Sequence, residues 1–215
     1  KQKYHGDETM WQKAEELMRQ AVAQVDIPMV EEIGSAAFYG PKIDFVIHSS
    51  IGREFAISTN QIDLFMGDRF KLRYTDSDGS EKTPVIIHRA PLGSHERFIG
   101  FLIEHFGGAF PLWLHPTQVA ILPVSDKFID YARSLESALS EAGIRIALSE
   151  STEGLGKKIR SAQLQKIPYM LIVGGKEEEA KTVSVRTRKE EDLGTMKLSD
   201  FIAKLTTQIA TKALD

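Results

Sequence analysis

Short apolar runs alternate with amphipathic helical segments along residues 117–215, and this alternation constrains the fold more than any other feature. The runs predicted as strands are Val119–Val124, Ile144–Leu148, Tyr169–Val173 and Thr182–Thr187. The segments predicted as helices are Lys127–Ala142, Leu155–Lys166 and Leu198–Ala213. Such alternation is typical of a mixed, mainly parallel sheet with helices on its faces. We therefore predict one α/β domain over residues 115–215.

Residues 1–114 follow a different pattern, which predicts an α+β domain. An amphipathic helix is expected over residues 9–25, with Asp7 or Thr9 as its cap. Four strand-like runs joined by turns follow it and predict an antiparallel sheet: Ile43–Ile47, Glu54–Ile57, Phe70–Tyr74 and Val85–His88. A helix that begins after Ser94 is apolar around most of its circumference, so we expect it to lie buried against this sheet.

Composition narrows the function classes. The chain of 215 residues contains no cysteine, which excludes disulfides and thiolate metal sites built from this chain alone. The net charge of −3 argues against nonspecific DNA binding, which depends on neutralising phosphates. No stretch approaches the roughly 20 consecutive apolar residues of a membrane span, and the N-terminus does not have the pattern of a signal peptide. We expect a cytoplasmic protein that binds neither DNA nor membranes.

Three stretches together resemble the class IIa aminoacyl-tRNA synthetases, and the threonyl-tRNA synthetases in particular. They are residues 37–45 (AFYGPKIDF), residues 85–100 (VIIHRAPLGSHERFIG), and the pair 142–145 (AGIR) and 167–174 (IPYMLIVG). The similarity runs in order through essentially the whole chain. It implies the C-terminal part of a class II catalytic domain over residues 1–114 and an anticodon-binding domain over residues 115–215. The implied activity is ATP-dependent activation of threonine to its adenylate, followed by transfer to tRNA(Thr).

The resemblance also implies roles for six residues of the first domain. Arg97 would stack on adenine and contact the ATP phosphates, a task that suits the planar guanidinium group. Gly93 and Ser94 belong to the same ATP-binding motif. Tyr39, Lys42 and Gln61 would face the amino acid and the adenylate, with Lys42 and Arg97 as the catalytic residues. Four of them also have an ordinary structural interpretation: Lys42 as a surface lysine, Gln61 as a polar strand residue, Gly93 as a helix-entry turn and Arg97 as a solvated charge.

His88 matches one of three zinc ligands in the family, although an isolated histidine at a strand end is more often part of a core. An open coordination position on zinc can bind the threonine hydroxyl, which valine lacks. In the family the other two zinc ligands and the arginine that holds the α-phosphate lie upstream of the position that Lys1 occupies. We therefore expect this chain alone to be inactive, the complete enzyme to be a homodimer, and Mg²⁺ to accompany ATP.

In the second domain, Glu177 and Arg186 match family positions that contact the anticodon. A carboxylate can accept from the Watson–Crick edge of guanine, and an arginine can stack on an unpaired base. Lys157, Lys158 and Arg160 form a basic patch suited to phosphates. The structural alternative is a set of solvated charges on helix surfaces, above all for the run Glu177–Glu179.

One departure from the family keeps two alternatives open. Relatives commonly have Gln-Cys-Gly-Thr where this chain has Ala56-Ile57-Ser58-Thr59, which removes a hydrogen-bonding group near the ribose. Either neighbouring groups replace it, or the chain is a noncatalytic, synthetase-like RNA-binding or regulatory protein. A third interpretation is another class IIa synthetase, for prolyl, glycyl or histidyl transfer. Those relatives do not hold their amino acid on such a zinc, so His88 favours the threonyl enzyme.

Overall fold

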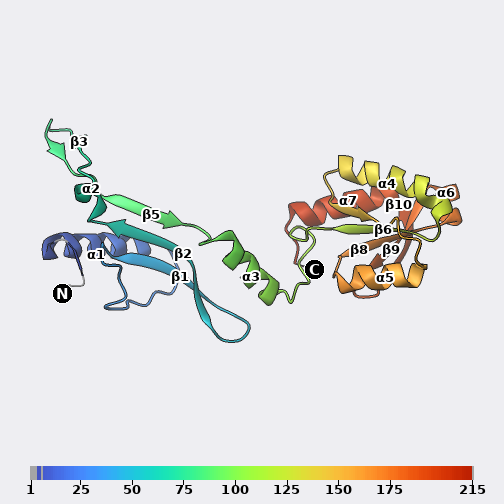
Figure 1. The fold of residues 1–215 in the computed structure, drawn as a ribbon, viewed down its shortest axis with the longest axis horizontal. Helices are drawn as coiled ribbons and strands as arrows, with labels where there is room; N and C mark the ends of the chain where they lie inside the picture. Colours follow the sequence, from blue (N-terminus) through green and yellow to red (C-terminus); the bar gives the residue numbers. More distant parts are fainter. Residues whose placement is uncertain (1–3, 6, 215) are drawn as a thin grey trace. The chain divides into compact units, whose positions relative to one another are not determined.

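The computed structural model describes residues 4, 5 and 7–214 and divides into two compact units (Figure 1). The N-terminal unit comprises residues 1–101 and the C-terminal unit residues 102–215. The division falls inside helix α3 (His95–His105), whereas the sequence-based boundary at residues 114 and 115 stays a prediction. Within the described part of the chain, no helix is both long enough and apolar enough to cross a membrane.

The N-terminal unit is built on a three-stranded antiparallel sheet in the order β1-β2-β5 (Figure 1). Its elements before α3 are α1 (Glu8–Val22), β1 (Lys42–His48), β2 (Glu54–Asp63), α2 (Met66–Arg69), β3 (Tyr74–Thr75), β4 (Glu81–Lys82) and β5 (Ile86–Ala90). The predicted four-stranded sheet is wrong in one respect. Strands β3 and β4 form a separate two-residue ladder, because the chain first makes the short helix α2 and then turns through Lys71, whose φ is +53°.

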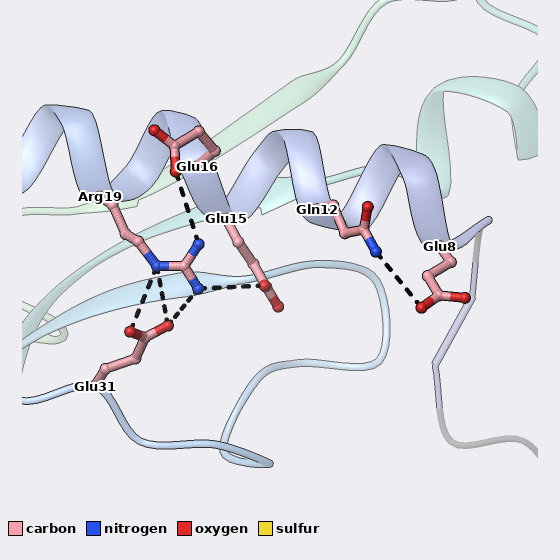
Figure 2. Close-up of polar contacts among 6 residues, drawn as sticks. All are labelled: Glu8, Gln12, Glu15, Glu16, Arg19 and Glu31. Carbon is pink, nitrogen blue, oxygen red and sulfur yellow. Dashed lines mark hydrogen bonds and ion pairs between the residues drawn. The ribbon is translucent and has the colours of Figure 1, made fainter.

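Helix α1 begins one residue before the predicted start and ends three residues before the predicted end. The Asp7 Oδ1 atom accepts a hydrogen bond from the Met10 backbone N–H at 2.8 Å, which caps the first turn. In the last turn, the Arg19 Nε atom donates to Glu31 at 3.1 Å, and Glu15 and Glu16 also pair with the same guanidinium (Figure 2). This exposed ion-pair cluster ties α1 to the segment that leads to β1.

Helix α3 corrects the prediction of a buried helix. None of its side chains is buried, and Ile99 and Ile103 are about half exposed. A helix that is apolar around most of its circumference needs cover on several sides, and a three-stranded sheet offers too little surface for that. The start of the helix does follow the sequence, because the Ser94 Oγ atom accepts from the Arg97 N–H at 3.3 Å.

The C-terminal unit is an α/β structure around a mixed five-stranded sheet in the order β10-β9-β8-β6-β7. After α3 its elements are β6 (Val119–Pro123), the 3-10 turn η1 (Asp126–Phe128), α4 (Ile129–Glu141), β7 (Ile146–Leu148), α5 (Leu155–Leu164), β8 (Tyr169–Val173), α6 (Gly175–Ala180), β9 (Thr182–Thr187), β10 (Asp192–Lys197) and α7 (Leu198–Ala210). Strands β7, β6 and β8 are parallel neighbours, while β9 and β10 are added in antiparallel pairing.

This sheet has an apolar core on each face. Helices α4 and α7 cover one face, where Leu135, Leu139 and Phe201 are almost fully buried against the strands. Helix α5 covers the other face through Ala162, which packs with Met170 of β8. The predicted α/β architecture is confirmed, and the pattern missed the short helix α6 and the strand β10. That strand lies at the sheet edge with no buried residue, so it lacks an apolar signal.

Candidate functional site

Three of the predicted site residues stand in one row across the N-terminal sheet. Lys42 of β1 pairs with Gln61 of β2, and Gln61 pairs with His88 of β5. Directly paired residues project from the same face of an antiparallel sheet. Strand periodicity adds Asp44, Thr59 and Asp63 to that face. We call this set, Lys42, Asp44, Thr59, Gln61, Asp63 and His88, the polar face.

A tight turn before β1 brings Tyr39 to the polar face. Gly40 is required there, since a Cβ atom on it would lie 1.8 Å from the Ile62 carbonyl oxygen. The Tyr39 hydroxyl donates to the Gln61 Oε1 atom, and the Tyr39 ring lies edge-on to the His88 ring at 5.7 Å. The Gln61 Nε2 atom in turn donates to the Thr59 hydroxyl oxygen at 3.1 Å. The turn and the register thus bring Tyr39, Gln61 and His88 together.

Lys42 is held by a neighbouring carboxylate. Its ammonium group pairs with Asp44, two residues along β1, and both side chains are largely covered. The pair leaves the polar face with a positioned cation beside the Tyr39–Gln61 hydrogen bond. An ammonium group held in this way has a defined direction, which a surface lysine on a flexible stem lacks.

Asp63 is the residue of this site that the sequence did not identify. Its side chain is only 1% exposed, and its Oδ2 atom lies 2.8 Å from the His88 Nε2 atom. Its Oδ1 atom accepts from the backbone N–H groups of Phe65 and Met66, at the start of α2. Burial alone would raise the pKa of the Asp63 carboxyl, but the hydrogen bonds from His88, Met66 and Phe65 outweigh it and lower that pKa.

The ATP-motif residues lie at the other end of β2. Gly93 has a φ of +64°, and a Cβ atom on it would contact the Ile57 carbonyl oxygen at 3.5 Å, so this turn runs beside the strand. Arg97 lies in the first turn of α3, its side chain is exposed, and it makes no ion pair among the described residues. The structure places Gly93 and Ser94 near the sheet but does not bring Arg97 into contact with the polar face.

The two predicted anticodon residues lie at different ends of one strand pair. Arg186 of β9 pairs with Met170 near the start of β8, whereas Glu177 follows the end of β8 in α6. Three residues of β8 follow Met170 before the strand ends, so Arg186 lies toward one end of the strand pair and Glu177 beyond the other. Glu177 is half-buried and accepts from the Gly174 N–H at 2.9 Å, so it caps its helix instead of standing free in solvent. The Arg186 Nε atom is buried and has no hydrogen-bond partner within the described chain.

The predicted basic patch is split by the structure. Lys158 is 4% exposed and donates to the Pro123 carbonyl oxygen at 3.0 Å, so it is a structural residue and not a surface phosphate ligand. Lys157 is exposed and paired with Glu153 one turn earlier. Arg160 lines an open hollow of about 420 Å³ with Gln163, Leu164, Arg188 and Glu190. Burial decides which of three adjacent cations remain available.

The described residues of the polar face can supply one ligand of a metal site, His88, but not a complete set of ligands. Among the described residues, no group of three or more His, Cys, Asp or Glu side chains is arranged to hold an ion. His88 by itself has the surroundings of a ligand, since a buried carboxylate holds its Nε2 atom and half of its side chain is exposed. Metal-bound histidines are commonly oriented by a carboxylate on the second ring nitrogen.

Comparison with protein families matches nearly the whole chain. Residues 1–106 match the tRNA synthetase class II core domain (G, H, P, S and T), and residues 118–208 match an anticodon binding domain. The chain is 49% identical over 212 residues to the threonine–tRNA ligase of Chloroherpeton thalassium, which covers 99% of this chain and 32% of that protein. It is 49% identical over 200 residues to the threonine–tRNA ligase of Thermus thermophilus, covering 93% of this chain and 30% of that protein.

A solved structure agrees in fold. The RNA binding domain of threonyl-tRNA synthetase from Cryptosporidium parvum Iowa II superposes with a TM-score of 0.84 at 35% identity, covering 95% of this chain and 52% of that one. The chain spans about a third of the length of the curated relatives it matches.

Proposed function

Because this chain belongs to the threonyl-tRNA synthetase family of class II aminoacyl-tRNA synthetases, we propose that it serves as part of a threonine–tRNA ligase. In this proposal the N-terminal unit contributes to ATP-dependent activation of threonine, and the C-terminal unit recognises the anticodon of tRNA(Thr). The observation that carries the proposal is the registered row of Lys42, Gln61 and His88, which gathers two candidate substrate-binding residues and a candidate metal ligand on one face of a sheet.

The polar face would bind and orient the amino acid. The Gln61 amide is fixed between the Tyr39 hydroxyl and Thr59, so its orientation is set before substrate arrives. Lys42, directed by Asp44, would stabilise negative charge as the carboxylate of threonine attacks the α-phosphate. Catalysis in this scheme comes from alignment and charge stabilisation, without a covalent enzyme intermediate.

His88 would supply one ligand to a zinc ion whose other ligands the described residues do not provide. A bound zinc ion supplies open coordination positions at which an amine and a hydroxyl group can be held together. On the nucleotide side, Arg97 is exposed and follows the Gly93 turn, so its guanidinium group is free to stack on adenine when ATP binds with Mg²⁺.

In the C-terminal unit, Arg186 and Glu177 would contact different nucleotides. They lie toward opposite ends of the β8–β9 strand pair, and single-stranded loops are recognised with their bases splayed apart. The buried Arg186 Nε–H group, without a partner in the described chain, would be satisfied by a base. Arg160, on the rim of the hollow, and the exposed Lys157 would bind the phosphate backbone.

The anticodon assignment is tested by tRNA binding to the 215-residue chain. We expect tRNA(Thr) to bind more tightly than the same tRNA with another anticodon, and Arg186→Gln to reduce that preference by roughly 1–3 kcal/mol. Arg160→Gln should weaken the binding of both tRNAs equally and reduce the salt dependence of that binding. Equal affinity of the parent chain for the two tRNAs would contradict the proposed role of the C-terminal unit.

The catalytic assignment is tested in a chimeric ligase, the Chloroherpeton thalassium threonine–tRNA ligase whose matched segment is replaced by this chain. We expect the chimeric ligase to charge tRNA(Thr) with threonine. Lys42→Met should reduce kcat for adenylate formation by about 100-fold or more, in the range of other lost transition-state donors. A chimeric ligase that binds tRNA without activating threonine would favour the noncatalytic alternative raised by Ala56–Thr59.

The proposal keeps two expectations from the sequence. The complete enzyme would act as a homodimer, and it would work in the cytoplasm. Sedimentation of the chimeric ligase, with and without tRNA(Thr), would measure the first of these directly.

A further inference from the structure

We infer that Asp63 is a positioning residue that holds His88 in the tautomer whose Nδ1 lone pair is free to bind a metal. The inference rests on the proposed function, in which His88 is a metal ligand. Asp63 and His88 are 25 residues apart in sequence and come from neighbouring strands. Asp63 touches neither of the amino-acid ligands Gln61 and Lys42 through any hydrogen bond in the described residues, so its role is exerted through His88.

The carboxylate of Asp63 is fixed independently of His88. Its Oδ1 atom accepts from the Phe65 N–H at 2.9 Å and from the Met66 N–H at 2.8 Å, at the first turn of α2. The side chain is 1% exposed, so it cannot rotate into solvent. Its second oxygen, Oδ2, is left for the His88 Nε2 atom at 2.8 Å. The acceptor is therefore rigid before any metal binds.

This acceptor determines which ring nitrogen of His88 carries the proton. A carboxylate accepts hydrogen bonds and has no proton to give, so a neutral His88 ring places its proton on Nε2. The Nδ1 atom then carries the lone pair, on a side chain that is half exposed. The Tyr39 ring, edge-on at 5.7 Å, adds a second restraint on the His88 ring. Carboxylates that fix the tautomer of a liganding histidine in this way also tune its affinity for the metal.

Asp63→Asn separates positioning from folding. The amide oxygen of asparagine can still accept from the Phe65 and Met66 N–H groups, so the start of α2 is kept. The amide nitrogen then faces His88 and donates to Nε2, which places the ring proton on Nδ1. The substitution therefore reverses the tautomer with almost no change in volume. Asp68→Asn is the matched control, because Asp68 lies in the same short helix with its side chain 78% exposed.

The first readout is the tautomer of His88 in the 215-residue chain, from long-range ¹H–¹⁵N correlation spectra recorded at pH 8. His88→Gln identifies the His88 signals among those of the six histidines. We expect the proton on Nε2 in the parent chain and in Asp68→Asn, and on Nδ1 in Asp63→Asn. A parent chain with its proton on Nδ1 overturns the inference, and this outcome does not depend on the folding of Asp63→Asn.

The second readout is the zinc dissociation constant of the chimeric ligase, measured by competition with a chelator. We expect Asp63→Asn to weaken zinc binding by about 10- to 100-fold, and Asp68→Asn to leave it unchanged. Unchanged zinc affinity in Asp63→Asn also overturns the inference. Loss of threonine charging by the parent chimeric ligase, with the expected tautomer in the chain, counts instead against the proposed function and not against Asp63 as the group that orients His88.

Discussion

The two units of this molecule differ in what holds them together. Apart from Ala14 and Pro41, every buried apolar side chain of the described residues lies in the C-terminal unit. There, two cores sandwich a five-stranded sheet. The N-terminal unit instead exposes large apolar side chains such as Ile87 and Ile99, and its order comes from strand register, turns and side-chain hydrogen bonds.

The two units also differ in where their candidate functional residues lie. In the C-terminal unit most apolar residues serve the core, and the candidate RNA ligands stand on strand ends and helix surfaces. In the N-terminal unit the six residues of the polar face lie in register on neighbouring strands, so register itself builds the candidate site. A substitution should therefore act through lost core packing in one unit and through lost alignment in the other.

Phe201→Ala should have the largest effect. Phe201 is fully buried and packs edge-on against Tyr169 with ring centroids 5.6 Å apart, so its truncation leaves a cavity in the larger core. We expect the free energy of unfolding of the C-terminal unit to fall by about 3–5 kcal/mol. Urea unfolding followed by Trp113 fluorescence measures it, because the other tryptophan, Trp11, lies in the N-terminal unit.

The matched control is Ile87→Ala in the N-terminal unit. Ile87 is 69% exposed, so its truncation should change the unfolding free energy by no more than about 0.5 kcal/mol. A loss for Ile87→Ala as large as that for Phe201→Ala would break the comparison between the two units.

Gly40→Ala tests alignment in the N-terminal unit. The new Cβ atom would overlap the Ile62 carbonyl oxygen, so the turn before β1 must move. We expect a loss of about 1–3 kcal/mol in unfolding free energy, followed by Trp11 fluorescence, together with loss of the Lys42–Gln61 register in amide spectra. Gly100→Ala is the control, because a Cβ atom there meets open space and alanine favours the helix. A stable Gly40→Ala chain with unshifted amide signals would contradict the role given to the turn.

Acidification should lower the free energy of unfolding of the C-terminal unit through His115. We expect this effect to be smaller than those of Phe201→Ala and Gly40→Ala. Burial is the main cause that lowers the pKa of this histidine, and the charges of Arg188 and Arg145 lower it further. The unfolded chain then binds more protons than the folded one below the ordinary histidine pKa of 6.5, so this contribution to stability is complete above that pH and falls as the pH drops through it. The slope cannot exceed about 1.4 kcal/mol per pH unit for one proton.

His115→Gln isolates this effect. Unfolding monitored by Trp113 between pH 7.5 and 5 should show a shallower pH dependence in the variant than in the parent chain. An identical dependence in both would assign the acid sensitivity to other groups of the C-terminal unit.

Sequence pattern predicted the C-terminal unit better than the N-terminal one. The strands β6 and β8 and the helices α4 and α7 were found because buried faces impose a regular apolar spacing. The pattern failed where burial was absent, at the edge strand β10 and at the short ladder of β3 and β4. The pattern also predicted too much burial for α3, because apolar residues are buried only where another surface covers them.

The sequence by itself determined the family, the two kinds of fold, and the candidate residues Tyr39, Lys42, Gln61 and His88, since motifs and periodicity are local properties of the chain. Only the tertiary structure decided which of these side chains share a face. It also separated Lys158, which is buried, from its exposed neighbours. Above all it placed Asp63 against His88, a contact across 25 residues. Such a pairing depends on strand register, which is set by the packing and hydrogen bonding of the whole sheet.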